Sequence, residues 1–533
     1  MKKMNMWIRK SAMQGCAMVM LLGVLAGCSG GPSEETETNK VESSGKGAES
    51  GTKYTVSWVS GQSAPVDEDA EMVAYWEEQL DVDLDVWNIE STNYSEVLNL
   101  RFASEEIPDR MVVLGFANLK KYADQDIIAE IPLEMLKEHA PNVYAKTVEA
   151  FPDTFNYTKI DGKLYGIPAI NYYSRFRSPI VWRGDWLRNV GIEKTPETLE
   201  EFETALYKLR NDDPNRSGKK DTYGISDSAL NLVYGAFGYL PDRWAEKDGK
   251  LVYGAVQPEM KDALKLLNQW YKDGVIDPEF VTGENKGGYW ALSHAFINGR
   301  IGLTSQGVYY HWKPLLFEGD GASHNYLELQ KLDPEAADAL VHGTPPAGRD
   351  GAMGVAQGNP MSGKVIAFGK HLEKQPEKLA KILEMIETIS ATSYNNYLTA
   401  MYGKKGKHWD FDENNVPVLL NNLQSQDLER MGANNVMESL ELPEYTAQRT
   451  AIISDWAENQ QYGIGGMTNK LQAPLASEGR YLTELEKIRE EAYISFITGD
   501  RPIDEFDAFV KSWRSSGGEQ LEKEANEWWE SVK

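Results

Sequence analysis

Side chains that carry oxygen recur at every second position in one short polar stretch of the chain. These potential ligands are Asp213, Asn215, Ser217, the carbonyl oxygen of Lys219, and Asp221, with Gly218 at the sixth place. Calcium takes six to eight oxygen ligands, and helix–loop–helix calcium loops supply them from alternate positions around a glycine turn. Gly224 replaces the bidentate glutamate of the twelfth place, so Thr222 or water would complete the shell. We expect a structural calcium site, with a plain solvated turn as the alternative.

Aromatic side chains in polar, glycine-rich surroundings are a second chemical signal. The chain has 15 Trp and 26 Tyr, and most of them are expected to serve the core. The exceptions are Tyr172, Tyr173, Trp244, Trp290, Tyr309, Tyr310, Trp312 and Trp409. Sugars present flat C–H faces that stack on such rings, while their hydroxyl groups need polar partners. As a set these residues indicate an aromatic-lined cleft, although burial is an equal alternative for each one alone.

Catalytic motifs are sparse. The seven histidines are scattered without an HExxH pattern, and no GxSxG nucleophile motif occurs. The stretch Gly358–Val365 nearly spells a phosphate loop, but Val365 stands where Ser or Thr must hold magnesium. Paired carboxylates for glycoside hydrolysis stay open, because chance pairs are inevitable among 81 acidic residues. These motifs therefore identify no catalytic residue.

The elements that must position these residues alternate between strands and helices. Alternating apolar residues predict strands at Tyr54–Ser60, residues 81–89 and Arg110–Phe116, with a helix over residues 72–80. This alternation predicts an α/β lobe with a parallel sheet.

Further helices are marked by their start signals. One follows the capping box of Thr198 and Glu201, and two others begin at Pro258 and Pro376. A body of about 480 residues is too large for one core, so two lobes with a cleft between them are expected. Trp58 and Gln306 would fall at the carboxyl ends of strands, where open α/β sheets bind ligands.

Composition and the N-terminal segment indicate where the protein is located and which partners are excluded. The formal net charge of −26 disfavours nucleic acid, and two cysteines cannot form a disulfide framework. Residues 1–27 join basic residues to a short apolar run, which is typical of a secretory signal. The run ends at Cys28 in LAGC, which is similar to a bacterial lipobox. We expect Cys28 to be diacylated, for example with palmitate, and residues 28–52 to be a flexible tether; an ordinary signal peptide is the alternative.

Several stretches of the chain resemble one family. They are DGKLYGIP (residues 161–168), IVWRGDWLRNVGIEKTPETLEEF (residues 180–202), HAFINGRIGLTSQGVYYHW (residues 294–312) and VIAFGKHLEKQPEKLAKILEMI (residues 365–386). With them the chain resembles the extracellular solute-binding lipoproteins of ABC sugar importers, in particular the large Gram-positive, oligosaccharide-binding branch of family 1. Tyr309 occupies the place of a sugar-stacking aromatic of maltose-binding proteins. The calcium-type loop is similar to that of alginate-binding proteins, which have an acid at the position of Thr222.

The resemblance implies a two-lobe, periplasmic-binding-protein-like α/β fold of class II, with a hinge and an interlobe cleft. The first lobe would take residues 53–168 and 367–455, and the second lobe residues 169–366 and 456–533. The protein would be a monomer that captures an oligosaccharide without breaking a bond. It would deliver this ligand to the permease subunits of an ABC transporter at the outer face of the cell membrane.

The expected ligand contacts are aromatic residues and their polar neighbours. They are Trp58, Asn171, Tyr172, Tyr173, Arg175, Trp244, Trp290, Gln306, Tyr309, Trp312 and Trp409. Arg175 would pair with a uronic acid. Arg183 is expected to form a structural salt bridge with Asp185, with pairing to a uronic acid as the alternative. Two other classes of function stay open: a tethered, calcium-stabilised polysaccharide hydrolase or lyase, and a peptide-binding importer component.

Overall fold

The computed structural model describes residues 53–171, 178–287, 289–314, 323–358, 361–413, 415–449 and 464–533. Within these residues the largest sheet has five strands. Their order is β2 (Val82–Glu90), β1 (Tyr54–Gln62), β3 (Arg110–Leu114), β13 (Met361–Phe368) and β6 (Ile167–Ile170). Strand β1 runs parallel to β2 and β3, which confirms the predicted parallel pairing. Strand β13 is antiparallel to both β3 and β6, a pairing between distant segments that local pattern does not show.

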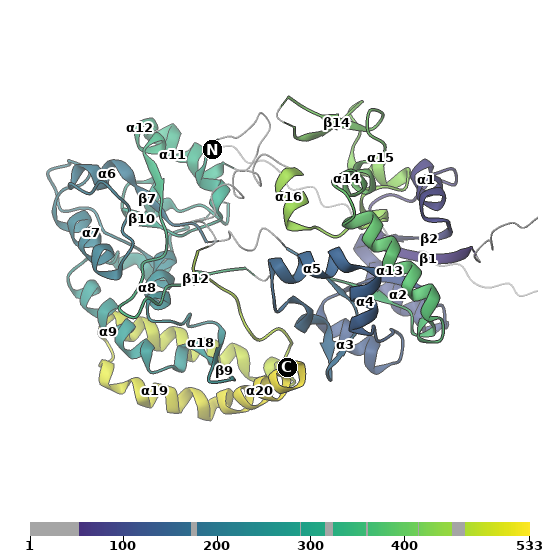
Figure 1. Ribbon diagram of the computed structural model, residues 1–533. Helices are drawn as coiled ribbons and strands as arrows, with labels where there is room; N and C mark the ends of the chain where they lie inside the picture. Colours follow the sequence, from purple (N-terminus) through teal and green to yellow (C-terminus); the bar gives the residue numbers. More distant parts are fainter. Residues whose placement is uncertain are drawn as a thin grey trace, which may run out of the picture. The chain divides into compact units, whose positions relative to one another are not determined.

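The two faces of this sheet pack into separate hydrophobic clusters, because side chains alternate along a strand. Val56 and Trp58 of β1 belong to one cluster and Val59 belongs to the other. We call this sheet and the elements packed around it the first lobe (Figure 1). Its helices are α1 (Glu71–Leu80), α2 (Tyr94–Ala103), α3 (Phe116–Asp124), α4 (Leu133–His139), α5 (Pro141–Ala150), α13 (Pro376–Ser390), α14 (Tyr394–Tyr402), α15 (Ser425–Arg430) and α16 (Pro443–Arg449). Two strand pairs complete it: β4 (Lys159–Ile160) with β5 (Lys163–Leu164), and β14 (Trp409–Phe411) with β15 (Pro417–Leu419).

The second lobe is built on a smaller sheet. Its strands are β10 (Leu303–Thr304), β7 (Val181–Arg183) and β11 (Leu340–His342), and β7 is antiparallel to both neighbours. Its helices are α6 (Gly184–Asn189), α7 (Leu199–Asn211), α8 (Leu230–Ala236), α9 (Glu259–Lys272), α10 (His294–Ile297), α11 (His324–Leu332), α12 (Pro334–Asp338), α18 (Glu478–Thr498), α19 (Phe506–Trp513) and α20 (Glu519–Val532). A hairpin of β8 (Trp244–Lys247) and β9 (Lys250–Tyr253) lies beside them. The lobe boundaries stay a prediction of the sequence.

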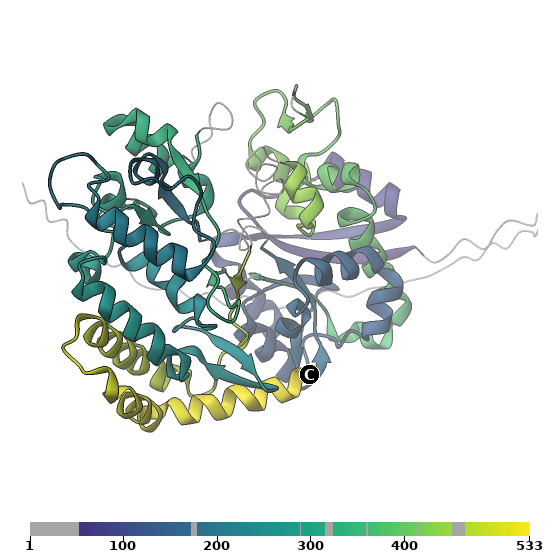
Figure 2. The ribbon, with the colours of Figure 1, turned by 60° about the vertical axis from the view of Figure 1, so that its left-hand side comes forward.

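The C-terminal helices belong to the core of the second lobe. One hydrophobic cluster joins Trp182, Phe202 and Trp270 to Phe496 and Trp513 from the end of the chain. The side-chain amide of Asn268 in α9 donates to two main-chain carbonyls at the end of α18, both at 3.0 Å. The yellow helices therefore lie against the teal helix α9 in Figures 1 and 2.

The predicted helix starts are confirmed. Helix α7 begins after a complete capping box, in which the Thr198 hydroxyl accepts from the Glu201 N–H and the Glu201 carboxylate accepts from the Thr198 N–H. Helices α9 and α13 begin at the prolines that the sequence marks, Pro258 and Pro376. Proline at such a position fixes φ without losing a helical hydrogen bond.

Two connecting segments between the lobes pair with each other. Strand β12 (Val355–Ala356) runs parallel to β16 (Gly466–Met467). The Arg243 guanidinium donates from the same nitrogen to the carbonyl oxygens of Gln357 and Met467, the latter at 2.9 Å. A Cβ added to Gly235 of α8 would lie 2.1 Å from the carbonyl oxygen of Gly354, so only glycine allows β12 to approach this helix. One side chain thus holds both connecting strands.

A buried carboxylate ties the first sheet to helix α13. Asp109 precedes β3, is 3% exposed, and accepts from the Ser57 N–H at 2.8 Å. The Lys378 ammonium and the His371 ring nitrogen each lie 2.8 Å from its Oδ1. Burial opposes ionisation, but the hydrogen bonds from His371, Lys378 and Ser57 outweigh it and lower the pKa of Asp109 to about 2.

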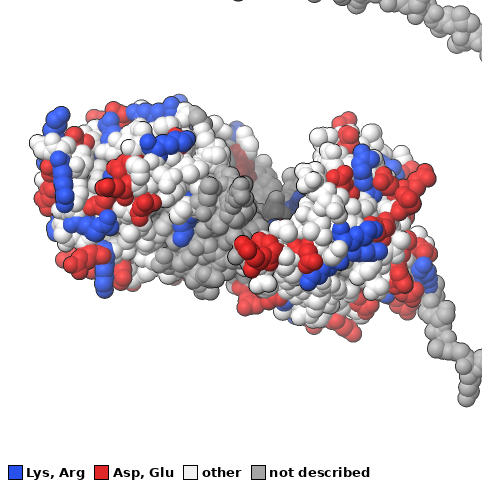
Figure 3. Space-filling model, turned by 90° about the horizontal axis from the view of Figure 1, so that it is seen from above, with Lys and Arg blue, Asp and Glu red and all other residues white. Residues whose placement is uncertain are grey.

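Charged side chains of both signs mingle on the surface. On the face drawn in Figure 3, red acidic and blue basic residues alternate over the part of the chain that is coloured. Many form exposed ion pairs such as Lys120 with Asp124, which contribute little stability individually. Within residues 53–533, apart from the segments left out above, no helix is long and apolar enough to cross a bilayer.

Candidate ligand-binding site

Trp290 differs from the other tryptophans of the structure. Its side chain is 55% exposed, and it is the only exposed tryptophan within the described ranges. Tyr289 beside it is 37% exposed, and the two ring centroids lie 5.7 Å apart. Exposing a large indole costs hydrophobic free energy, so a paired exposed Trp and Tyr mark a candidate recognition surface.

The loop that carries these rings is held at both of its ends. The Asn285 side-chain amide donates to the Tyr289 carbonyl oxygen at 2.7 Å. Near the other end, the buried Asn325 donates to the Ala291 carbonyl oxygen at 2.9 Å and accepts from the Ser293 N–H at 3.1 Å. The rings are therefore presented by an anchored loop.

Gln306 lies against this loop from the neighbouring strand end. It follows β10 by two residues, so the prediction that it falls at a strand end is confirmed. Its side-chain amide donates to the Trp290 carbonyl oxygen at 3.0 Å. The Trp312 indole N–H in turn donates to the Gln306 carbonyl oxygen at 2.8 Å. We call Tyr289, Trp290 and Gln306 the platform.

His311 contacts both rings of the platform. The Tyr289 hydroxyl lies 3.3 Å from His311 Nε2, and the His311 and Trp290 rings meet edge to face with centroids 5.8 Å apart. Burial, together with the nearby His324, lowers the pKa of His311 to about 4. The imidazole that touches the platform is therefore neutral at neutral pH, and it adds no charge to the surface.

Five aromatic residues predicted to contact ligand are buried in the structure. They are Trp58, Trp244, Tyr309, Trp312 and Trp409. A fully enclosed ring has no free face for a sugar, so these five serve the cores in this structure. Two of the indole N–H groups donate to main-chain carbonyl oxygens: Trp409 to Gly403 at 2.7 Å, and Trp312 to Gln306.

Trp58 is also not at the end of its strand. Strand β1 continues to Gln62, because its parallel pairing with β2 extends to Glu90. Trp58 thus lies at the strand centre, with its indole N–H donating to the Val436 carbonyl oxygen at 2.9 Å and the Arg110 guanidinium 4.5 Å above its ring. The prediction of a strand-end position for Trp58 is wrong.

Of the other predicted ligand contacts, some lie within the described residues and some lie outside them. Asn171 is half-buried directly after β6, at the edge where β1 and β3 also end. Tyr172, Tyr173 and Arg175 lie outside the described residues. Arg183 forms the predicted salt bridge with Asp185, and the structure shows that it is bidentate, at 2.8 and 2.6 Å.

Sequence reasoning missed two members of this site. Tyr289 shares the glycine-rich stretch of Trp290, and that shared context was the available signal. Glu284 starts the same loop and is buried, and nothing in its sequence surroundings distinguishes it from the other acids.

The calcium-type loop brings its oxygens together. Asp213 accepts from the N–H groups of Ser217 and Gly218 at 2.9 and 3.0 Å. Asp221 accepts from the Asn215 side-chain amide at 3.0 Å and from the Ser217 hydroxyl at 3.1 Å. All of the alternate positions therefore face one another, with positive φ at Asp213 and Gly218 shaping the turn. This donor set of side-chain and main-chain oxygens fits calcium.

Thr222 points away from this loop. Its hydroxyl is buried and donates to the Leu209 carbonyl oxygen at the end of α7, at 2.7 Å. Its side chain is therefore engaged elsewhere, and water is the remaining source of further ligands. Within the described segments no group of three or more His, Cys, Asp or Glu side chains is placed to hold a metal, and this loop has only two carboxylates.

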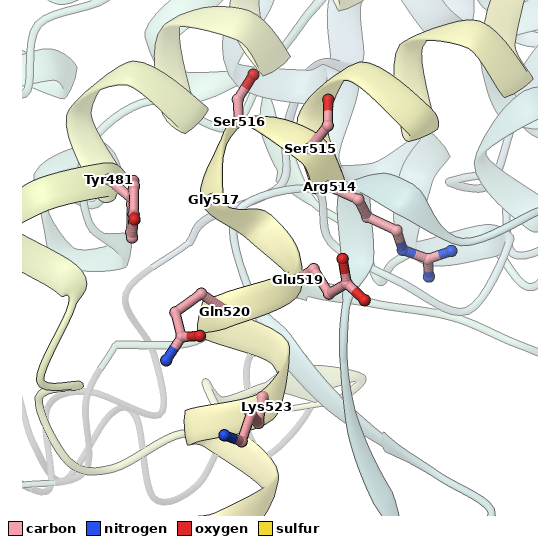
Figure 4. A pocket seen from close by; sticks show the side chains of 8 residues that line it. All are labelled: Tyr481, Arg514, Ser515, Ser516, Gly517, Glu519, Gln520 and Lys523. Atoms are coloured by element: carbon pink, nitrogen blue, oxygen red, sulfur yellow. The ribbon is translucent and has the colours of Figure 1, made fainter.

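A pocket at the bend between α19 and α20 has a different character (Figure 4). Its lining residues are Tyr481, Arg514, Ser515, Ser516, Gly517, Glu519, Gln520 and Lys523. Arg514 is already paired with Glu522 at 3.1 Å, and the Tyr481 ring packs where a Cβ of Gly517 would lie. The lining mixes both charges and leaves no paired aromatic faces, so the platform is the stronger candidate.

Comparisons with known proteins agree with this fold. Residues 71–313 match the family described as bacterial extracellular solute-binding protein. The polygalacturonan/rhamnogalacturonan-binding protein YtcQ of Bacillus subtilis (strain 168) is 26% identical, over 97% of this chain and 98% of its own. Lipoprotein LipO of the same organism is 23% identical over the same shares.

A solved structure supports the same fold class. It is an HMO-binding, ABC-transporter-associated solute-binding protein from Bifidobacterium longum infantis ATCC 15697. The TM-score is 0.56 at 14% identity, and the match covers 90% of this chain and 99% of that chain. Residues 71–313 are thus similar to bacterial extracellular solute-binding proteins, and the chain shares the two-lobe α/β fold of the solved structure. YtcQ and the protein of the solved structure are both named as binding proteins.

Proposed function

We propose that this protein is the oligosaccharide-capturing component of an ABC importer. It would stack a sugar ring on Trp290 and Tyr289, hydrogen-bond it through Gln306, enclose it in a cleft between the lobes, and deliver it intact to permease subunits as a monomer. The observation that carries the proposal is the exposed Trp290 on an anchored loop. The similarity to YtcQ, which is named as a polygalacturonan/rhamnogalacturonan-binding protein, supports a carbohydrate ligand.

A binding screen tests this proposal. Residues 29–533 would be titrated calorimetrically with galacturonan and rhamnogalacturonan fragments, with neutral oligosaccharides, and with a mixed peptide pool. A bound sugar should also raise the melting temperature by mass action, and mass spectrometry should recover it unbroken. Binding of peptides alone, or the absence of binding to any sugar, would contradict the oligosaccharide proposal.

Membrane attachment through Cys28 is a separate proposal. Residues 1–52 lie outside the described residues, so it rests on the LAGC pattern and on the relative named as a lipoprotein. Two acyl chains anchor a protein stably to a membrane, whereas an unmodified protein has no such anchor. We expect Cys28→Ala to release the protein from the membrane fraction into the medium. Retention of the Cys28→Ala variant on membranes, measured beside a Cys16→Ala control, would exclude this anchor.

We also propose that calcium binds at Asp213, Asn215, Ser217, Lys219 and Asp221 and stabilises the second lobe. Calcium at a hundredfold its dissociation constant would add about 2.7 kcal/mol to the free energy of unfolding. A chelator should therefore lower the melting temperature, and the double variant Asp213→Ala with Asp221→Ala should no longer respond. The control is Asp212→Ala, an exposed neighbour outside the alternating pattern. An unmodified protein that melts identically with calcium and with chelator would show that the loop is only a turn.

A further inference from the structure

Glu284 is a buried carboxyl group at the base of the loop that carries Trp290. It is 1% exposed, and its two oxygens accept hydrogen bonds from the hydroxyls of Ser228, Ser293 and Thr304, each at 2.5 Å. These hydroxyls come from the turn before α8, from the residue that caps α10, and from the last residue of β10. One carboxyl group therefore joins three different secondary-structure elements.

Two of these hydroxyl oxygens also accept hydrogen bonds from main-chain N–H groups. A hydroxyl has a single proton, and because that proton goes to Glu284, the hydroxyl oxygen is left to accept. The Ser228 oxygen accepts the N–H of Ser305 at 2.8 Å, and the Thr304 oxygen accepts the N–H of Gln306 at 3.1 Å. The main chain that carries Gln306 is thus fixed to Glu284 through two hydroxyls.

Both parts of the platform depend on this carboxyl group. Tyr289 and Trp290 follow Glu284 in the same loop. The Gln306 side-chain amide donates to the Trp290 carbonyl oxygen, so it connects the two parts of the platform. We propose that Glu284 is a positioning residue for ligand binding, which holds the rings and the amide of the platform in one arrangement through three hydroxyls. Glu284 itself touches no ligand. This inference rests on the proposed function, because it concerns the same site.

The charge of Glu284 changes near neutral pH. Burial and then the charge of Asp227 raise the pKa of Glu284 to about 7, although three hydroxyls favour its ionised form. The ionisable group that acts on it is Asp227, whose own pKa is raised by burial. The main-chain N–H of His294 donates to the main-chain carbonyl oxygen of Glu284 at 3.0 Å. A protonated carboxyl group donates, so one of the hydroxyls must then redirect its proton. Acidification therefore loosens the connection to the platform.

Hydrogen exchange in the ligand-free protein tests this role without any sugar. The variant Glu284→Gln keeps the size of the side chain and removes its charge. We expect the amides of Ser305 and Gln306 to exchange about three- to tenfold faster at pH 6 than at pH 8, after correction for intrinsic rates, as the loss of one hydrogen bond predicts. In Glu284→Gln they should exchange at the faster corrected rate at both pH values, and acrylamide should quench Trp290 fluorescence differently from the unmodified protein.

The matched control is Glu387→Gln. Glu387 is a buried carboxylate of the first lobe that accepts from the N–H groups of Asn142 and Val143, so its loss should leave both readouts of the platform unchanged. If Glu284→Gln does not fold, Thr304→Val and Ser228→Ala each remove one hydroxyl link and should accelerate exchange at Gln306 and Ser305, respectively. Unchanged exchange in these folded variants would overturn the positioning role.

Binding measurements separate this inference from the proposed function. The probes are an oligogalacturonide mixture and a neutral fructo-oligosaccharide, each titrated at pH 6 and pH 8. For a probe that binds, affinity should fall about three- to tenfold on acidification in the unmodified protein and should stay at the lower value in Glu284→Gln. A Glu284→Gln protein with the unmodified affinity and pH profile would overturn the inference, even where Trp290→Ala abolishes binding. Altered exchange without binding of any sugar would instead overturn the proposed function.

Discussion

Trp290→Ala is expected to weaken oligosaccharide binding by at least about 30-fold, which corresponds to about 2 kcal/mol of binding free energy. Tryptophans at the centre of a recognition surface commonly contribute this much, because a rigid ring buries a large area at little entropic cost. The side chain of Trp290 is 55% exposed, so its loss removes little core packing. The melting temperature of the ligand-free protein should therefore stay nearly unchanged.

Calorimetric titration with the sugar found by the screen measures this effect. Trp290→Phe keeps an aromatic face and should retain part of the affinity. Trp528→Ala is the matched control, because Trp528 is a half-buried tryptophan of α20 that packs against the core of the second lobe. Equal affinities of Trp290→Ala and the unmodified protein would show that the sugar binds elsewhere.

Asp109→Ala is expected to lower the free energy of unfolding of the first lobe by about 3 to 5 kcal/mol, the usual cost of removing one partner from a buried ion pair. The change leaves the Lys378 ammonium and the Ser57 N–H without the acceptor that they share. It also separates β1 and β3 from α13, since one carboxylate holds all three. Urea unfolding followed by circular dichroism gives the measurement.

The same carboxylate predicts a dependence on pH. The pKa of Asp109 is lowered from 3.8 to about 2 in the folded protein, so its stabilisation is complete above pH 4 and is lost as the pH falls toward 2. The stability difference between the unmodified protein and Asp109→Asn should shrink over that interval. Asp124→Asn is the control, because Asp124 pairs with Lys120 on the surface and should cost less than about 1 kcal/mol. A small, pH-independent effect of Asp109→Asn would contradict the proposed role of this group.

Local signals predicted the elements of this fold well. The capping box of Thr198 and the prolines at 258 and 376 mark real helix starts, because these residues act on the chain within one turn. Alternation predicted β1, although its last residues were missed because pairing with β2 decides where the strand ends. The antiparallel pairing of β13 depends on a segment far along the chain, which no local pattern encodes.

The candidate site was harder to predict than the fold. Glycine-rich surroundings predicted loops for Trp312 and Trp409, but Trp312 ends a 3-10 helix and Trp409 begins strand β14. Both rings are buried, and each indole N–H donates to a nearby carbonyl oxygen. Whether an aromatic residue anchors its loop or projects from it depends on such contacts. Glu284 lacked any local signal, because its partners Ser228 and Thr304 come from other segments.

The shared hold of Arg243 on β12 and β16 has a mechanical consequence. The two strands pair with each other, and the Arg243 guanidinium donates to the main chain after or within each of them. We therefore expect a bend in one strand to be accompanied by a bend in the other, and β12 and β16 to move together in any movement of one lobe about the other.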